Sequence, residues 1–275
     1  MKSNHFLKFA LSAVLVGTIV VSCESENNEE IDLIDTQVRA KLESLGFNTD
    51  NLTEDSLNGV DGFTVEGDIF LTRDQINEMA PASGVGTEHY RTNNIVGPDG
   101  RVVSVYMDAA FNSTMQAAFD DAINRYNSLN LDITFQRANS SGADIDILSQ
   151  KLKRVRGGGV ILGRSAGFPD ANGDPATPIV LNSDIYNPRR GGIPADAATV
   201  IAHEIGHAIG FRHTDYDQRE FSCGRAGNEG DAGVGAVYIP GTPTGPEAGS
   251  WMLACSNGTN RPFTSGDQTA LTTVY

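Results

Sequence analysis

Hydrophobic and polar positions follow two periods along the chain, and these periods predict its helices and strands. Between residues 115 and 126, apolar side chains recur every three or four positions, which is typical of a helix with one buried face. Ser113 with Gln116 predicts a capping box that begins this helix. Residues 131–136 and 143–148 instead alternate apolar and polar positions, as half-buried strands do. This part of the chain therefore combines helical and extended segments.

The same reading extends to the end of the chain and predicts one domain over residues 91–275. Further strands are expected at residues 101–107, 160–168 and 179–185. Ser265 with Gln268 predicts the cap of a short last helix. A segment of this length is sufficient for a single hydrophobic core, so we expect one α+β domain.

Residues 31–90 predict a smaller region in front of that domain. Residues 34–45 carry apolar side chains at helical spacing, and residues 63–71 are expected to be extended. Residues 72–79 predict a short helix, and the glycine-containing polar stretch from residue 84 to residue 100 predicts a linker.

The first thirty residues predict export. Two lysines precede an apolar run that is too short to span a bilayer, so residues 1–22 are expected to be a signal peptide. The run ends in Val-Val-Ser-Cys, which resembles a lipobox and implies lipidation of Cys23; a plain secretory signal is the alternative. Residues 23–30 are acidic and polar and predict a solvated tether. We expect a lipid-anchored protein at the outer membrane or cell surface, with release on maturation left open.

Charge limits the classes of partner. The chain has a formal net charge of −15 and a pI near 4.6. Nucleic-acid binding requires a basic surface that neutralises phosphates, so nucleic acid is excluded as the expected partner. The acidity is better explained as a contribution to solubility.

Cysteine usage agrees with an exported protein. If Cys23 carries lipid, Cys223 and Cys255 remain as an even pair in an oxidising compartment. We expect a disulfide between them, and the alternative is two buried free thiols.

One short window carries the chemistry. His203 and His207 are four residues apart, so on a helix they project from the same face. Gly210 permits the left-handed backbone that ends a helix and returns His213 toward that face. Three imidazoles with an open fourth position predict a catalytic Zn²⁺ site, with Glu204 beside the open position. The alternative is a core helix whose histidines are only hydrogen-bonded.

The pattern H-E-x-x-H-x-x-G-x-x-H resembles that of the metzincin zinc endopeptidases, and His-Glu-Ile-Gly-His is similar to the bacterial dual-action HEIGH metallopeptidases. The resemblance implies one catalytic zinc ion, a twisted mixed sheet, an active-site helix and a loop-rich C-terminal subdomain. It also implies that residues 160–168 form an edge strand that binds substrate in antiparallel orientation. Ser250-Trp251-Met252 resembles the Met-turn that underlies the imidazoles in that family; a gap-filling core methionine is the alternative.

The N-terminal region contains a second resemblance. Residues 65–69 are similar to the F-x-G-D motif of astacin-type prosegments, although Val65 stands where that family has phenylalanine. The resemblance implies that Asp68 occupies the open position of zinc and keeps the enzyme latent. A turn or strand edge with an ordinary exposed Asp68 is the alternative.

A calcium site is a weaker hypothesis. Asp170, Asn172 and Asp174 alternate along one loop and offer oxygen ligands. Pro175 stands where EF-hand spacing needs a glycine, and the late glutamate is missing. A plain turn is therefore favoured over Ca²⁺ binding.

The predicted function is hydrolysis of peptide bonds in protein or peptide substrates, with Glu204 as the general base. One alternative is a surface binding protein that keeps zinc but cleaves nothing. Another is a zinc hydrolase that acts on a non-peptide amide.

Overall fold

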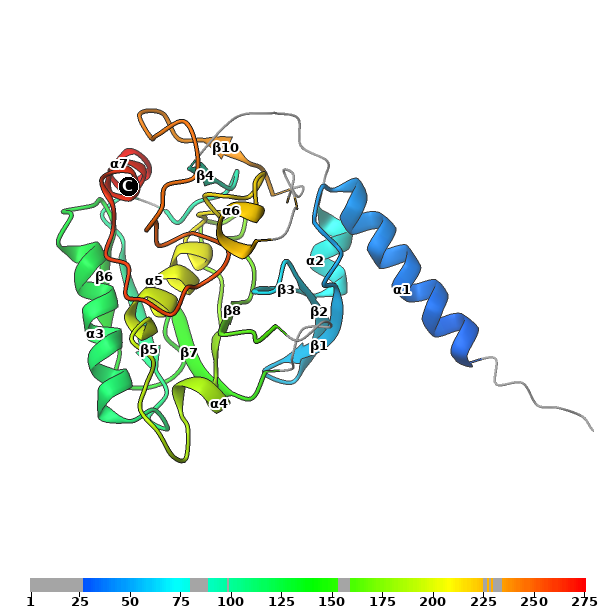
Figure 1. Cartoon of the computed structure of the whole chain (residues 1–275), viewed down its shortest axis with the longest axis horizontal. Helices are drawn as coiled ribbons and strands as arrows, with labels where there is room; N and C mark the ends of the chain where they lie inside the picture. Colours follow the sequence, from blue (N-terminus) through cyan, green and yellow to red (C-terminus); the bar gives the residue numbers. More distant parts are fainter. Residues whose placement is uncertain are drawn as a thin grey trace, which may run out of the picture.

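The computed structural model shows a mixed α/β protein built around one twisted sheet (Figure 1). It describes residues 27–79, 89–97, 99–152, 159–224, 227, 229 and 234–275. The predicted signal peptide and Cys23 lie outside these residues. No helix within the described ranges is long and apolar enough to cross a membrane.

The sheet brings strands from the two halves of the chain side by side. In spatial order, its described strands are β1 (Thr53–Leu57), β2 (Val60–Val65), β3 (Ile69–Leu71), β8 (Gly163–Ser165), β9 (Ile179–Asn182), β7 (Ile145–Gln150), β5 (Val102–Met107) and β6 (Thr134–Arg137). The last four run parallel to one another, whereas β8 is antiparallel to β9. β3 pairs in parallel with β8, so the N-terminal strands cover the outer edge of β8.

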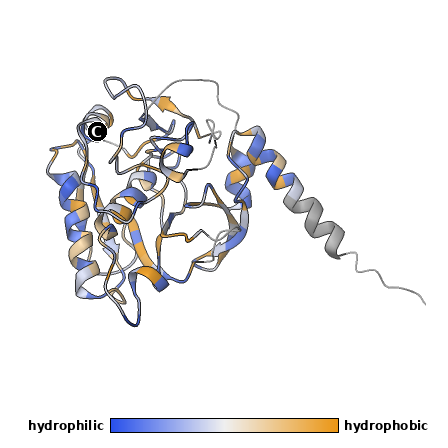
Figure 2. Ribbon diagram, in the orientation of Figure 1, coloured by the Kyte–Doolittle hydropathy of each residue, from blue (hydrophilic) through white to orange (hydrophobic). Residues whose placement is uncertain are grey.

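The main hydrophobic core lies between the central strands and two helices, α3 (Ser113–Asn127) and α5 (Ala197–Ala208). The predicted apolar face of α3 is buried: Met115, Phe119, Ala122, Ile123 and Tyr126. The Tyr126 hydroxyl donates a hydrogen bond of 2.6 Å to the carbonyl of Ala202, which fastens α3 to α5. Figure 2 shows hydrophobic residues on the central strands and polar residues on the outer helices and loops.

Both predicted capping boxes were placed one residue too late. Asn112, and not Ser113, caps α3, and Thr264 with Asp267 forms the capping box of α7 (Ser265–Val274). Asn, Ser and Thr all cap helices well, so residue type alone does not choose among neighbouring positions. The extended backbone at Asn112 and Thr264 decides the position, and the incoming chain sets that backbone.

A second hydrophobic core lies between α1 (Asn27–Ser44), α2 (Arg73–Glu78) and strands β2 and β3. Its buried residues are Val38, Leu42, Leu45, Phe47, Phe63, Val65, Ile69, Leu71 and Ile76. α1 begins at Asn27, so the tether predicted at residues 23–30 is wrong for its last four residues. Acidic residue types are favourable at the N-terminus of a helix, and the apolar pattern does not register them.

Residues 63–71 form a hairpin and not the single extended segment that the sequence predicted. Val65 of β2 pairs with Ile69 of β3, and the turn between them contains Glu66 and Gly67. Both turn residues have positive φ, 57° and 104°, a conformation that glycine adopts without strain. The turn places Asp68 directly before β3.

Part of the predicted linker belongs to the main domain. β4 (Tyr90–Arg91) pairs with β10 (Val237–Tyr238), and His89 Nε2 lies 2.8 Å from Asp267 Oδ1. Thr92 is also buried and donates from its hydroxyl to the carbonyl of Asn94 at 2.6 Å. The linker prediction is therefore wrong for residues 89–97. A hydrophobicity pattern does not distinguish a buried polar residue with hydrogen-bond partners from an exposed residue of a loop.

Two single-turn helices complete the described elements, α4 (Ser183–Tyr186) and α6 (Glu220–Cys223). α4 shortens the strand predicted at residues 179–185, because the Asn182 side chain accepts from the amide of Asp184 and caps a helical turn.

Candidate metal centre

Three imidazole nitrogens converge at the C-terminal end of α5. His203 and His207 lie one turn apart on this helix, and Gly210, with φ of 109°, turns the chain immediately after it. The turn returns His213 to the same place. His207 Nε2 lies 3.1 Å from His203 Nε2 and 3.2 Å from His213 Nε2.

The opposite nitrogen of each ring is held by an acceptor. The acceptors are the carbonyl of Trp251 for His203 at 2.8 Å, the carbonyl of Phe211 for His207 at 2.9 Å, and Glu229 Oε1 for His213 at 2.7 Å. A nitrogen facing such an acceptor must carry the hydrogen. Each Nδ1 is thereby held by an acceptor and each Nε2 faces the other two rings, the arrangement that metal-ligating histidines have.

This cluster fits a zinc ion. Two nitrogens about 2.0–2.1 Å from a tetrahedral zinc ion are about 3.3–3.4 Å apart, close to the observed separations. Burial, together with His203 and His213, holds the pKa of His207 well below its usual range, so this ring stays neutral. The three histidines and Asp68 form a buried group whose ligand atoms lie close enough together to hold one metal ion.

Glu204 lies beside the cluster with one oxygen available. It is 2% exposed, and its Oε2 has no hydrogen-bond partner among the described residues. Burial raises the pKa of its carboxyl well above the usual value, and the charge of Asp68 raises it further. Gly163 of β8 packs against this carboxylate: a Cβ at that position would lie 2.5 Å from Glu204 Oε1.

Met252 lies beneath the histidines. Its Sδ would be 2.5 Å from a Cβ on Gly206, so the residue between the two helical ligands must be small. Met252 is fully buried, and its carbonyl accepts from the amide of Thr214, next to the third histidine. The preceding Trp251 provides the carbonyl that orients His203.

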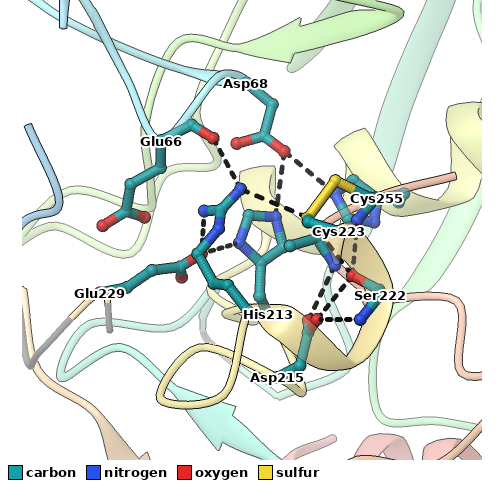
Figure 3. Close-up of a disulfide and its surroundings, with 11 residues drawn as sticks. Glu66, Asp68, His213, Asp215, Ser222, Cys223, Glu229 and Cys255 are labelled. Carbon is teal, nitrogen blue, oxygen red and sulfur yellow. Dashed lines mark hydrogen bonds and ion pairs between the residues drawn. A yellow bond between two sulfur atoms is a disulfide. The ribbon is translucent and has the colours of Figure 1, made fainter. Parts of the chain in front are cut away.

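Asp68 reaches the histidines from the N-terminal hairpin (Figure 3). Its Oδ2 lies 3.0 Å from His213 Nε2 and 3.6 Å from His203 Nε2, and its Oδ1 has no partner among the described residues. Burial opposes ionisation, but His213 and His203 hold the pKa of Asp68 well below its usual value. Asp68 and the three histidines thus form one group of four possible metal ligands. The side chain of Asp68 is 14% exposed.

A family model described as dual-action HEIGH metallo-peptidase matches residues 63–275. The chain belongs to this family. It is therefore a zinc metalloendopeptidase, as the sequence predicted. The matched region begins within β2 and includes the hairpin that carries Asp68.

Two solved structures are also similar to the chain. Myroilysin is 14% identical, with a TM-score of 0.42 over 67% of this chain and 97% of that chain. High choriolytic enzyme 1, a hatching enzyme zinc-protease from the medaka fish Oryzias latipes, is 16% identical, with a TM-score of 0.38 over 66% of this chain and 93% of that chain. No curated protein sequence matches the chain.

This HEIGH metallo-peptidase also has a buried charge network that sequence reasoning missed. Glu229 is fully buried, ion-pairs with Arg219 and hydrogen-bonds to His213 (Figure 3). Burial opposes its charge, but His213 and Arg219 lower the pKa of Glu229 to about 2. Glu66 of the hairpin turn faces the same network, with its Oε2 3.8 Å from Arg212 Nη2. A single carboxylate in a glycine-rich loop belongs to no recognisable spacing, so no sequence signal marked Glu229.

The two remaining cysteines are joined near the metal centre. A disulfide links Cys223 of α6 to Cys255, which follows the Met252 turn. Ser222 fixes the neighbouring backbone: its hydroxyl donates to Asp215 Oδ2 at 2.5 Å and accepts from the amide of Cys255 at 3.0 Å (Figure 3). The expected pairing is present, and it fastens α6 to the segment behind the Met252 turn.

The loop considered for calcium makes its own contacts. Asp170 Oδ1 accepts from the amides of Asn172 at 2.8 Å and Asp174 at 2.9 Å, as in a tight turn. These hydrogen bonds hold the pKa of Asp170 below its usual value. Asp174 also pairs with Arg101 at 2.9 Å, so the loop carboxylates are engaged within the protein.

Proposed function

We propose that the chain cleaves internal peptide bonds of protein substrates, with His203, His207 and His213 as the zinc ligands and Glu204 as the general base. The observation that carries this proposal is the convergence of three Nε2 atoms beside a buried carboxyl group whose Oε2 has no partner among the described residues. A zinc site with three protein ligands has room for a reacting group, whereas structural zinc sites have four protein ligands.

Zinc and Glu204 have different roles in the proposed hydrolysis. Bound zinc supplies Lewis-acid chemistry that activates water and polarises the scissile carbonyl. Glu204 takes the proton of the attacking water at its free Oε2 and passes it to the departing amine nitrogen. The raised pKa of Glu204 suits a group that must hold this proton between the two transfers. No side chain forms a covalent bond to the substrate.

The edge strand β8 supports a protein substrate over a small amide. β8 runs past Glu204, and in this structure its outer edge is paired with β3. A strand edge that accepts β3 can bind the main chain of another extended segment in the same way. A small non-peptide amide has no extended main chain that could pair with this strand.

Substitution of Glu204 tests the catalytic proposal. Glu204→Ala should retain about one zinc ion per chain and lose at least about a hundredfold in cleavage of casein. His213→Ala should lose both zinc and cleavage. A zinc-replete Glu204→Ala protein that still digests casein would contradict the assigned role. Wild-type protein that binds zinc but cleaves no substrate after processing would favour the alternative of a zinc-containing binding protein.

Asp68 supports a further part of the proposal, that the N-terminal region keeps the enzyme latent. Its carboxylate lies against two ligand histidines, where zinc would accept it as a further ligand. The backbone carbonyl of Asp68 also accepts from the amide of Ser165 at 2.9 Å, so the hairpin occupies the substrate edge as well. Activation then requires removal of this region. Because His89 and Tyr90 are packed into the main domain, the cut must fall before them.

Latency is testable in the full chain. Asp68→Ala should raise the casein activity of the uncut protein, whereas Asp61→Ala should not, because Asp61 is an exposed carboxylate of the same hairpin. Limited proteolysis followed by N-terminal sequencing should show activity appearing together with loss of the hairpin. If Asp68→Ala and wild-type full chains are equally active, the carboxylate is not the inhibitor.

The lipobox-like sequence supports export and lipid anchoring through Cys23. Radiolabelled palmitate fed to expressing cells should label wild-type protein and not Cys23→Ser. The Cys23→Ser protein should also appear in the soluble extracellular or periplasmic fraction. Unlabelled wild-type protein in the membrane-free fraction would support a plain secretory signal.

A further inference from the structure

A cavity of about 510 Å³ extends from the metal centre and contains a buried arginine with unused donors. His203 and Glu204 line one part of it, and Arg261 lines another. Arg261 is 6% exposed, and its Nε has no hydrogen-bond partner among the described residues. Among the described residues, no hydrogen bond or ion pair to the two Nη atoms of Arg261 is found. A buried charge of this kind costs free energy unless a partner compensates it.

The nearest carboxylates within the protein are engaged elsewhere. Asp196 accepts from Tyr186 and Ser256, Asp215 from Ser222 and Ala254, and Asp267 from Ser250, Trp251 and Thr264. Burial lowers the pKa of Arg261 below its ordinary value, and these three carboxylates offset the effect only in part. The other arginine in the cavity wall, Arg219, is ion-paired with Glu229.

The backbone of Arg261 is held by hydrogen bonds that do not involve its guanidinium group. Its amide donates to the Thr199 hydroxyl at 2.7 Å, and its carbonyl accepts from Arg125 at 3.2 Å. Thr199 belongs to α5, so the arginine is fixed relative to the zinc-binding histidines. These contacts involve only the backbone of Arg261; its side chain belongs to the cavity wall, and its Nε keeps no partner among the described residues.

We propose that Arg261 makes this enzyme select substrates with an aspartate or glutamate immediately after the cleaved bond. This inference rests on the proposed function and names its substrate class. The carboxylate of that residue would enter the cavity and form charged hydrogen bonds with the free donors of Arg261.

The direction of β8 decides which substrate residue enters the cavity. Residues 159–163 line the cavity, and the chain runs from them along β8 toward Ser165. A substrate strand antiparallel to β8 runs the opposite way and carries its C-terminal part toward residues 159–163. The cavity therefore receives the side chain on the amine side of the cleaved bond.

The N-terminal region shows the same charge complementarity. Three of its carboxylates, Asp50, Glu66 and Asp68, line the cavity while it is in place. When the region leaves, the cavity loses these three carboxyl groups and keeps Arg261. The carboxylate of an acidic substrate would then take the place of the carboxyl groups that the N-terminal region contributes to the cavity before its removal.

The test uses the full chain after limited proteolysis and a set of matched peptides. Two peptides are identical and C-terminally amidated, except for Glu or Gln after the cleaved bond. Wild-type enzyme should cleave the Glu peptide about 10- to 100-fold more efficiently in kcat/KM, the range expected for a hydrogen bond to a charged group. A third peptide, with Gln and a free C-terminal carboxylate, should be cleaved no faster than the amidated Gln peptide.

Two variants assign the preference to the arginine. Arg261→Gln should reduce the Glu-over-Gln ratio in kcat/KM to within about threefold. Arg261→Lys should restore part of the ratio, because it restores the charge without the planar guanidinium. Arg189→Gln is the matched control, since it removes an exposed arginine that does not line the cavity, and it should leave the ratio unchanged.

The outcomes separate this inference from the proposed function. Equal cleavage of the Glu and Gln peptides by wild type overturns the selection by Arg261 while peptidase activity stands. A preference that survives in Arg261→Gln, or a preference for the free C-terminus, also overturns it. If no peptide is cleaved, the proposed function fails, and binding of the fluorescently labelled peptides to zinc-loaded Glu204→Ala protein still decides the inference: Glu must bind more tightly than Gln.

Discussion

Several residues at the metal centre matter because they lack a side chain. Gly163 leaves room for the Glu204 carboxylate, and Gly206 leaves room for Met252. Neither glycine needs a positive φ, so backbone freedom is not the reason for its presence. The reason is close approach, which appears only when the sheet, α5 and the Met252 turn have been assembled.

Gly163→Ala should therefore damage catalysis more than folding. The new methyl group would displace the flexible end of Glu204 from its place beside the histidines. We expect casein turnover to fall on the order of 10- to 100-fold, because positioned general bases contribute factors of about this size or larger. Zinc content and circular dichroism should stay those of wild type. Normal turnover in a folded, zinc-loaded Gly163→Ala protein would show that Glu204 does not depend on this contact.

Glu229 acts through His213, which makes it a positioning residue. Glu229→Gln keeps the shape of the side chain but removes the charge that holds the Nδ1 hydrogen of His213. Loss of such a partner typically weakens metal affinity about 10- to 100-fold. Competition with a zinc chelator should reveal this loss, and Glu220→Gln in the nearby helix α6 provides a control. Unchanged zinc affinity would mean that His213 keeps its position without the charge of Glu229.

At the level of elements, the periodic segments were predictable and the irregular ones were not. α3 and the zinc-binding turn follow from apolar spacing and from Gly210, because local geometry alone decides them. The hairpin at Glu66 was missed because its strands are short and its turn has a non-glycine residue at positive φ. β1, which pairs with β2, was missed because Thr53–Leu57 contains too few apolar residues to show alternation.

The site divides in the same way. The histidines, Glu204 and Met252 belong to one spaced motif and one short turn, so the sequence alone predicts that they lie together. Glu229, Gly163 and Arg261 come from three separate segments. Their roles depend on distances across the assembled fold, and their residue types are ordinary in loops and strands.

The hydrogen bonds and the ion pair of Asp144, which join β5 to the start of β7, should make the free energy of unfolding depend on pH. Asp144, just before β7, accepts from the hydroxyl and the amide of Ser104 in β5 and pairs with Arg101. Although burial opposes its charge, these contacts hold the pKa of Asp144 below its ordinary value. A depressed pKa stabilises the fold above the unfolded-state value, near 4, and this contribution is lost as the pH falls through the lower folded-state value.

Asp144→Asn should accordingly lower the free energy of unfolding at pH 7 by about 1 kcal/mol. This is the contribution of a hydrogen bond to a charged group, reduced because the side chain is partly exposed to solvent. The difference from wild type should shrink as the pH is lowered below about 4. Urea unfolding at several pH values measures both effects. Asp99→Asn, at an exposed position, should differ little from wild type throughout. A constant difference at all pH values would mean that the Asp144 charge is not the source of stability.

At the level of the whole molecule, three hydrophobic cores of the described residues share one sheet. One belongs to the main domain and one to the N-terminal region, and the third contains residues from both, among them Phe70 of β3 and Val180 of β9. The metal centre lies beside the pairing of β3 with β8, with Asp68 from one side and the histidines from the other. The same contact that completes the sheet therefore covers the outer edge of β8 beside the metal centre.

The loop-rich C-terminal part has little regular structure, so its stability should depend on the Cys223–Cys255 disulfide. The bond closes a segment with a sequence separation of 32, and a loop of that size contributes about 3–4 kcal/mol by restricting the unfolded chain. The Cys223→Ser/Cys255→Ser protein should unfold on the order of 10 °C lower than wild type. Both proteins should be measured in calorimetry with a chelator present, so that differences in zinc content do not enter.

Reducing agent provides the second arm of this test. It should lower the unfolding temperature of wild type to that of the double variant and leave the variant unchanged. Because Cys223 and Cys255 line the cavity, the reduced wild-type enzyme should also cleave peptides less efficiently at temperatures below unfolding. Equal unfolding temperatures for wild type and variant in the absence of reductant would show that Ser222, Asp215 and the Met252 turn hold this part of the chain without the bond.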